Sequence, residues 1–152
     1  MKRIFFTFLF IAAFLTGYSQ LSNNGGTITV ESGATIVIEG NYTSSGTASI
    51  EIDGSVQLKG DFVNNGGDIA SGSTGTLTLN GTTDQTIGGT NTTNFYCAVV
   101  VNKPSGGVLL GANEVLQNAL TLTSGKLTLN AYDLTMAAVG ITADASNYVV
   151  TN

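Results

Sequence analysis

The 152-residue chain contains no histidine, no tryptophan, one cysteine and one proline, and only five of its residues are lysine or arginine. Without histidine, the chain cannot assemble a Ser-His or Cys-His pair for nucleophilic catalysis. Ten acidic residues outnumber the five basic ones, which gives a net charge of −5. The chain therefore has too few basic residues to form a groove that binds phosphates, and we expect no nucleic-acid partner.

What the chain does contain favours strands. Hydrophobic residues make up 42% of the sequence, too many for a disordered chain, and there are 20 glycines. Threonine, asparagine and serine are abundant, whereas the good helix formers glutamate, lysine and arginine are scarce. The length suits one modest domain. The composition predicts a single all-β domain.

The first 19 residues have the pattern of a secretory signal peptide. Lys2 and Arg3 precede an apolar run over residues 4–15, and Gly17 and Ser19 are small residues of the kind that signal peptidase reads. The run has 12 residues, whereas a membrane-spanning helix needs about 20, and no cysteine follows it for lipidation. We expect cleavage between Ser19 and Gln20, no permanent membrane anchor, and a location outside the cell or on its outer surface. The alternative is a buried N-terminal helix.

An internal repeat of about 21 residues follows the signal peptide. Gly33, Gly54 and Gly75 are each 21 residues apart, while a second glycine series at positions 40, 60 and 81 is spaced by 20 and 21. Turn-forming sequences recur with a similar period: NNGG at 23–26, SSG at 44–46 and NNGG at 64–67. Regularity over three copies indicates a repeat architecture. We expect glycine and asparagine corners that adopt positive φ.

Between the corners, apolar residues alternate with polar ones, as in Ile36 and Ile38 or Leu77 and Leu79. Alternation of period two predicts short half-buried strands. A single coil buries too few side chains to offset the conformational entropy of ordering it, so coils must stack and share a core. The prediction is a parallel β-solenoid over residues 20–152 with coils of 20–21 residues. An antiparallel β-sandwich is the competing architecture, since turns every 8 to 12 residues suit it too.

Stacking predicts which side chains meet on neighbouring coils. Glu39 and Lys59 both precede aligned glycines and should lie one above the other, and Tyr42 and Phe62 should form an aromatic pair. After Gly81 the periodicity loosens. Residues 95–102 predict one strongly buried strand and residues 103–107 a turn, and the later strands fall at 108–110, 120–125, 126–130 and 132–136.

The segments QTIGG (85–89), FYCAVVVN (95–102) and LTLTSGKL (120–127) resemble the Thr- and Asn-rich repeats of large secreted proteins of Bacteroidetes. Those proteins are mostly surface or adhesin-like β-helices exported by the type IX secretion system. The resemblance implies a β-helix and a surface role, and it carries over no catalytic residue. Family members usually end in a C-terminal sorting domain, whereas this chain stops at Asn152. We expect a fragment of a longer protein, or a protein released without that route. The uncapped last coil would then be covered by more chain or by another copy.

The candidate site residues are few. Cys97 shares a strand face with Val99 and Val101, which indicates a buried thiol more than a reactive one. The NNGGD turn at 64–68 offers oxygen ligands for calcium but lacks the regular nonapeptide of calcium-loaded β-rolls. Acidic residues that could pair across a glycosidic bond are Glu31, Glu39, Glu51, Asp53, Asp61 and Asp68, and Glu31 and Glu51 could stack. Thr-x-Thr pairs at 27/29, 76/78 and 121/123 do not recur in every coil, as an ice-binding array would require.

These observations predict no enzyme, no cofactor and no resident metal. Removal of residues 1–19 leaves three lysines, no arginine and ten acidic residues, a net charge of −7 that disfavours a lyase acting on acidic sugars. We expect an exported structural or adhesive solenoid, a stalk or surface-interaction module, whose partners are glycans or neighbouring surface proteins. The alternative is a carbohydrate-active β-helix that binds or cleaves a polysaccharide.

Overall fold

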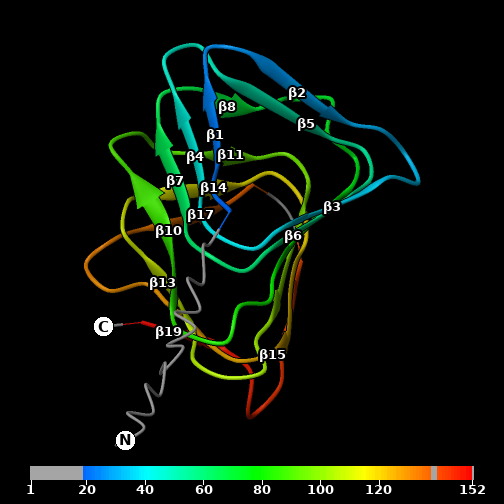
Figure 1. Cartoon of the computed structure of the whole chain (residues 1–152). Helices are drawn as coiled ribbons and strands as arrows, with labels where there is room; N and C mark the ends of the chain where they lie inside the picture. The colour runs from blue at the N-terminus through cyan, green and yellow to red at the C-terminus, as the bar shows by residue number, and fades with distance from the viewer. Residues whose placement is uncertain (1–18, 138–139, 152) are drawn as a thin grey trace, which may run out of the picture.

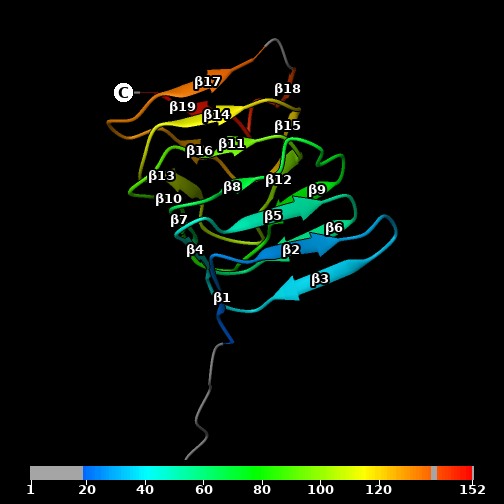
Figure 2. The same ribbon diagram turned by 90° about the horizontal axis from the view of Figure 1, so that it is seen from above.

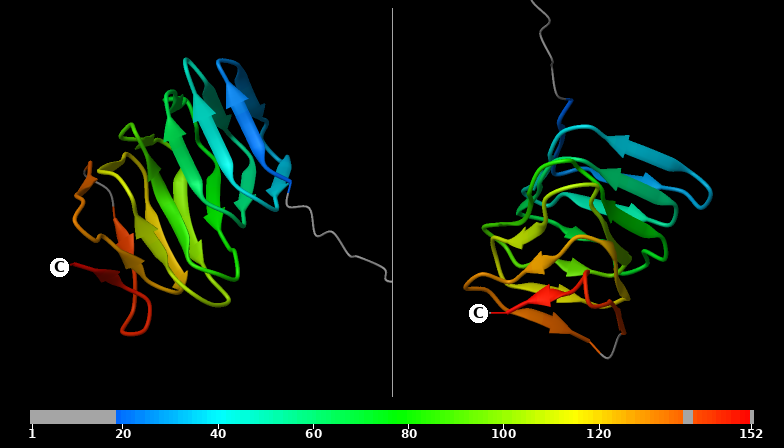
Figure 3. Two further views of the ribbon diagram at one scale, coloured as in Figure 1. Left: turned by 60° about the vertical axis from the view of Figure 1, so that its left-hand side comes forward. Right: turned by 90° about the horizontal axis from the view of Figure 1, so that it is seen from below.

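The computed structural model describes residues 19–137 and 140–151, and the predicted signal peptide therefore lies almost wholly outside the described residues. The described chain winds into about six stacked coils of short strands (Figure 1). Each coil runs through three strands before the next begins beside it, and Figure 3 shows the coils in chain order from the blue first strand to the red last one. Every strand pair within these residues is parallel. The predicted parallel β-solenoid is confirmed, and the β-sandwich alternative is wrong.

The coils present three faces. The first strands of the coils form the seven-stranded face: β1 (Leu21–Asn24), β4 (Tyr42–Ser45), β7 (Phe62–Asn65), β10 (Gln85–Gly89), β13 (Val108–Leu110), β16 (Leu127–Thr128) and β19 (Val149–Val150). The third strands form the six-stranded face: β3 (Thr35–Ile38), β6 (Ser55–Leu58), β9 (Thr76–Leu79), β12 (Ala98–Asn102), β15 (Leu120–Ser124) and β18 (Ile141–Thr142).

The second strands form a face that is divided in two, here called the split face. One half contains β2 (Thr27–Val30), β5 (Ser49–Ile52) and β8 (Asp68–Ile69), and the other contains β11 (Asn94–Phe95), β14 (Glu114–Leu116) and β17 (Leu134–Met136). Figure 2 shows the six strands following one another along the solenoid, although β8 and β11 are not joined by a backbone ladder.

The core is a set of rows of apolar side chains that run from coil to coil. On the six-stranded face, one row consists of the paired residues Ile38, Leu58, Leu79, Val101 and Leu122, all less than 5% exposed. Because each residue lies on its equivalent in the next coil, the alternation within one strand becomes a continuous buried column. Each inward side chain of one coil thus packs on the inward side chain at the paired position of the next coil.

Both predicted cross-coil pairs are present. Lys59 Nζ donates to Glu39 Oε1 at 2.7 Å and to Oε2 at 2.9 Å. Tyr42 lies opposite Phe62 in register, with ring centroids 5.1 Å apart, and Phe95 extends the aromatic contact across the core at 5.3 Å from Phe62. The 20- and 21-residue glycine spacing therefore predicted the register correctly in the first three coils.

The reason for the 21-residue glycine series differs from the predicted one. Gly33 has a positive φ of 82°, but Gly54 and Gly75 do not. A Cβ on Gly75 would overlap the carbonyl oxygen of Gly54, and a Cβ on Gly54 would overlap the carbonyl oxygens of Ala34 and Glu31. At these two positions glycine is required by the close approach of neighbouring coils and not by its conformational freedom.

In the later coils, the strand predicted at 126–130 is shorter, Leu127–Thr128, and another predicted strand is interrupted by a corner. Residues 95–102 were predicted as one strand, but the chain turns at Tyr96 and Cys97, so that β11 ends at Phe95 and β12 begins at Ala98. Phe95, Cys97 and Val99 are all buried, each at most 2% exposed. The apolar run crosses a corner because side chains on both sides of that corner point into the core. The turn at 103–107 and the strand at 108–110 are confirmed.

Candidate functional site

The strongest candidate for a site is the corner between the six-stranded and seven-stranded faces. All three lysines of residues 19–137 and 140–151 lie there, on different coils: Lys59 after β6, Lys103 after β12 and Lys126 before β16. We call this edge the lysine corner. Elsewhere on the described surface the charged residues are acidic, so this corner is where a mixed-charge surface exists.

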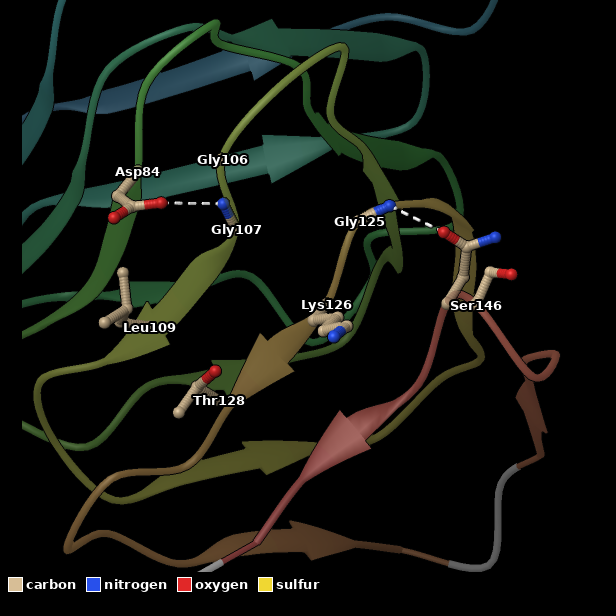
Figure 4. A pocket seen from close by; sticks show the side chains of 9 residues that line it. Asp84, Gly106, Gly107, Leu109, Gly125, Lys126, Thr128 and Ser146 are labelled. Carbon is tan, nitrogen blue, oxygen red and sulfur yellow. Dashed lines mark hydrogen bonds between the residues drawn. The ribbon is translucent and has the colours of Figure 1, made fainter.

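A groove of about 360 Å³ opens at the later coils of the lysine corner (Figure 4). It is lined by Asp84, Gly106, Gly107, Leu109, Gly125, Lys126, Thr128, Ser146 and Asn147. Leu109 and Thr128 are adjacent outward residues of β13 and β16, so one wall is a pleated strand surface with an apolar and a hydroxyl side chain. Asp84 and Lys126 supply one negative and one positive charge.

Hydrogen bonds between coils hold the groove in place. Asp84 Oδ1 accepts the N–H of Gly107 at 2.8 Å, and Asn147 Oδ1 accepts the N–H of Gly125 at 2.8 Å. Asn147 is itself bound to Asp144, whose pKa lies below its usual value because the backbone N–H of Ser146 and then the Asn147 side chain donate to the carboxylate. These contacts fix the Asp84 carboxylate and the Asn147 carboxamide in the groove lining.

A buried ammonium lies beneath the turn that borders this groove. Lys103 is 2% exposed, and its Nζ donates to Thr83 O and to Gln85 Oε1, both at 2.6 Å. Gln85 is also buried and donates to Leu58 O at 2.9 Å. Burial lowers the pKa of Lys103, while the nearby Asp84 and Asp61 carboxylates act in the opposite direction. Lys103 therefore anchors the turn at 81–84 to the core and is not available to a ligand.

A second groove of about 540 Å³ lies on the other side of that turn. It is lined by Gln20, Glu39, Gly40, Asn41, Lys59, Gly60, Thr82 and Thr83. The Glu39–Lys59 ion pair occupies it, with side chains 55% and 41% exposed. In this groove the two charges neutralise each other, whereas in the first groove Lys126 Nζ lies over the ring of Tyr148, 4.7 Å from its centroid.

The six acidic residues considered for glycoside hydrolysis are not brought onto one surface. Glu51 lies opposite Thr29 in the β2–β5 register, so it does not stack on Glu31, and Glu39 is paired with Lys59. Asp53 Oδ1 accepts the N–H and the hydroxyl of Thr74, and Asp61 Oδ1 accepts the N–H of Thr86. Two of these carboxylates therefore join neighbouring coils at corners, where a strand ladder is interrupted.

The NNGGD turn at 64–68 uses its side chains in the same way. Asn64 is 1% exposed, and its Oδ1 accepts hydrogen bonds from Ser44 Oγ and from the N–H of Gly66. Asp68 Oδ1 accepts hydrogen bonds from the N–H groups of Ile69 and Asn94. Positive φ in this turn is found at Gly66 and Gly67, not at the asparagines. The expectation of left-handed asparagines at this corner is wrong: Asn64 is an inward strand residue that satisfies the corner backbone. No group of three or more Cys, Asp or Glu side chains within the described ranges is close enough to hold a metal ion.

Cys97 is fully buried, as predicted, but it lies at the corner before β12 and not on one strand with Val99 and Val101. Burial raises the pKa of its thiol to about 12, which makes the thiolate scarce at neutral pH. The Thr-x-Thr pairs lie on β2, β9 and β15, that is, on two different faces, and Val100 of β12 separates Thr78 from Thr121. They form no common array.

Comparisons with known proteins do not assign the chain to a family. No protein family, no curated protein and no solved structure matches it. Among the residues that the structure describes, no helix is long and apolar enough to cross a membrane. The function must therefore be inferred from the fold and from the lysine corner.

Sequence reasoning missed the buried polar residues Gln85, Lys103 and Glu114. In the sequence, nothing besides their charge marks Asp84 and Lys126 as site residues. The one signal that could have found Glu114 is period two, because Glu114 occupies the same inward phase as Leu116 two residues later.

Proposed function

We propose that the chain is an exported structural and adhesive β-solenoid, a stalk or surface-interaction module of a bacterial secreted or cell-surface protein. The observation that carries this proposal is the stack of coils itself. Strands of two to five residues repeat in register through the described chain, with a continuous core and ladder hydrogen bonds between coils. Such an array is a rigid support that places corner residues at fixed spacings along its length.

The partner that best suits the first groove is a neutral glycan. Asp84 and Asn147 supply oxygen acceptors, Lys126 and Thr128 supply donors, and Leu109 supplies an apolar contact. This mixture complements a sugar, which carries hydroxyls at its edge and C–H groups on its face. The net charge of −7 on residues 20–152 would repel an acidic polysaccharide, so the proposal favours neutral sugars.

A glycan array tests the adhesive part of the proposal. Protein comprising residues 20–152 should be retained on at least one neutral glycan, and Asp84→Asn should weaken retention about tenfold, because a charged acceptor is lost while the bond to Gly107 can be kept. Asp53→Asn is the matched control: it alters a carboxylate that accepts from Thr74 at a different corner, and it should bind like the wild type.

Two outcomes would contradict the proposal. Absence of retention on every glycan and on intact bacterial surfaces would refute adhesion through this corner. Cleavage of any polysaccharide in a broad panel would instead favour a carbohydrate-active β-helix. The structural part is tested separately, by digestion with a nonspecific protease, which should leave the described coils intact.

A further inference from the structure

A buried lysine and a buried glutamine lie in contact inside the fourth coil, which runs through β10, β11 and β12. Lys103 follows β12 and is 2% exposed, while Gln85 is the first residue of β10 and is 1% exposed. Lys103 Nζ lies 2.6 Å from Gln85 Oε1. Since a C=O bond is about 1.23 Å long, Nζ is at most about 3.8 Å from the carbonyl carbon Cδ. An amine and an acyl carbon are therefore held close together inside the protein.

The surroundings of Lys103 favour an uncharged amine. Among the described residues, no carboxylate forms an ion pair with Lys103. Its two hydrogen-bond acceptors, Thr83 O and Gln85 Oε1, match the two hydrogens of a neutral amine and leave the nitrogen lone pair free. Burial lowers the pKa of Lys103, against the smaller opposite effect of the Asp84 and Asp61 charges. The uncharged amine is the nucleophilic form of lysine.

The carboxamide of Gln85 is held at both of its polar atoms. Oε1 also accepts the N–H of Gly81 at 2.7 Å, and Nε2 donates to Leu58 O at 2.9 Å and to Gly60 O. When an amine adds to Cδ, negative charge develops on Oε1, where the Gly81 N–H is already in place. The backbone at Gly81 therefore stabilises the charge that such an addition creates.

We propose that Lys103 and Gln85 join through an isopeptide bond in the folded chain. The bond between Lys103 Nζ and Gln85 Cδ forms, the Cδ–Nε2 bond breaks, and one proton passes from Nζ to Nε2, which leaves as ammonia. Asp84 and Asp61, whose charges act on Lys103, are the carboxylates that can carry this proton. The reaction needs no oxidant, reductant or co-reactant. This modification goes beyond the proposed adhesive function and does not depend on glycan binding.

The fold supplies what this slow reaction needs. Two groups held in contact react with effective molarities of about 10⁵–10⁸ M. Burial of the pair also excludes the water that would hydrolyse the carboxamide instead. The product joins residues 85 and 103 and so closes the fourth coil, the coil whose split-face strand lacks a ladder to β8. We expect the bond to form after folding and to be absent from the unfolded chain.

Mass spectrometry tests the proposal on the wild-type protein. The folded protein is incubated at neutral pH, then unfolded in urea and digested with trypsin. Trypsin cleaves after Lys59 and Lys126 but not between Lys103 and Pro104, so one peptide, 60–126, contains both reacting residues. Loss of ammonia should make this peptide about 17 Da lighter than its sequence.

Fragmentation of the same peptide locates the bond without any substitution. Because residues 85 and 103 would close a ring, backbone cleavage between them should give no separated fragments, whereas cleavage outside them should. A sample kept in urea from the start should have the full mass, since only the fold brings the two side chains together. Full mass in the folded sample after prolonged incubation would overturn the proposal.

Lys103→Arg is the matched variant, because a guanidinium group keeps a donor at this position but does not attack an amide. Its peptide 60–126 should have the full mass. The Asn65–Gly66 and Asn80–Gly81 pairs of this peptide can also lose ammonia by forming a succinimide. A mass deficit that persists in Lys103→Arg would therefore place the loss elsewhere and would also overturn the proposal.

Discussion

The close approach of coils at Gly75 leads to a prediction about stability. Gly75→Ala should destabilise the solenoid by about 3 kcal/mol. The added Cβ would overlap the carbonyl oxygen of Gly54 and would lie 2.7 Å from the carbonyl carbon of Asp53, so the two coils must separate locally. Overpacking of this kind costs about 1–3 kcal/mol. The separation also weakens the bonds from Gly75 N–H to Ile52 O (2.7 Å) and from Thr76 N–H to Gly54 O (3.0 Å), at about 1 kcal/mol each.

The matched control is Gly26→Ala. Gly26 also lies outside the left-handed region, but a Cβ there would meet only the Asn23 side chain, at 3.4 Å. Its substitution should be neutral or should stabilise slightly, because alanine restricts the unfolded chain. Urea unfolding followed by far-ultraviolet circular dichroism measures both variants. If Gly75→Ala and Gly26→Ala unfold within about 0.5 kcal/mol of each other, close coil contact is not the reason for glycine at position 75.

Three further predictions concern side chains. Phe62→Ala should cost about 3–5 kcal/mol in urea unfolding because Phe62 contacts both Tyr42 and Phe95, whereas Val63→Ala, on the outward side of the same strand, should cost less than 1. A double-mutant cycle on Glu39 and Lys59 should give a coupling below about 1 kcal/mol, since both side chains are solvated; a larger value would contradict the stated exposure. Burial raises the pKa of Glu114 from 4.5 to about 7, so between these pH values the folded state binds a proton that the unfolded state has lost. The stability of the wild type should therefore fall by about 3 kcal/mol relative to that of Glu114→Gln between pH 4.5 and pH 7. Parallel pH profiles of the two proteins would refute this.

The part of the fold that sequence reasoning predicted is the part that repeats. Gly33, Gly54 and Gly75 recur at the coil length, and alternation around them shows which phase faces the core. Those two facts are enough to predict a parallel stack and the Glu39–Lys59 pair, because stacking converts spacing in sequence into contact in space.

The polar interior could not be predicted in this way. Lys103 is buried because Gln85 and Thr83, 18 and 20 residues earlier, supply acceptors, and Gln85 in turn needs the carbonyl oxygen of Leu58. These separations do not follow a single coil length, since Phe62 pairs with Ile87, 25 residues on, where the turn at 81–84 lengthens the coil. A buried polar group is predictable only when all of its partners are known, and here they come from different coils.

The missing ladder between β8 and β11 has a consequence for folding kinetics. Each coil contacts mainly its neighbours, so closing a loop of about 21 residues recurs with a similar entropic cost as each coil is added. The first pair of coils forms without an existing template, and every later coil docks on one. At the fourth coil, one of its three strands lacks that template. Propagation should therefore pause there, so that a folding intermediate would contain the first three coils already closed.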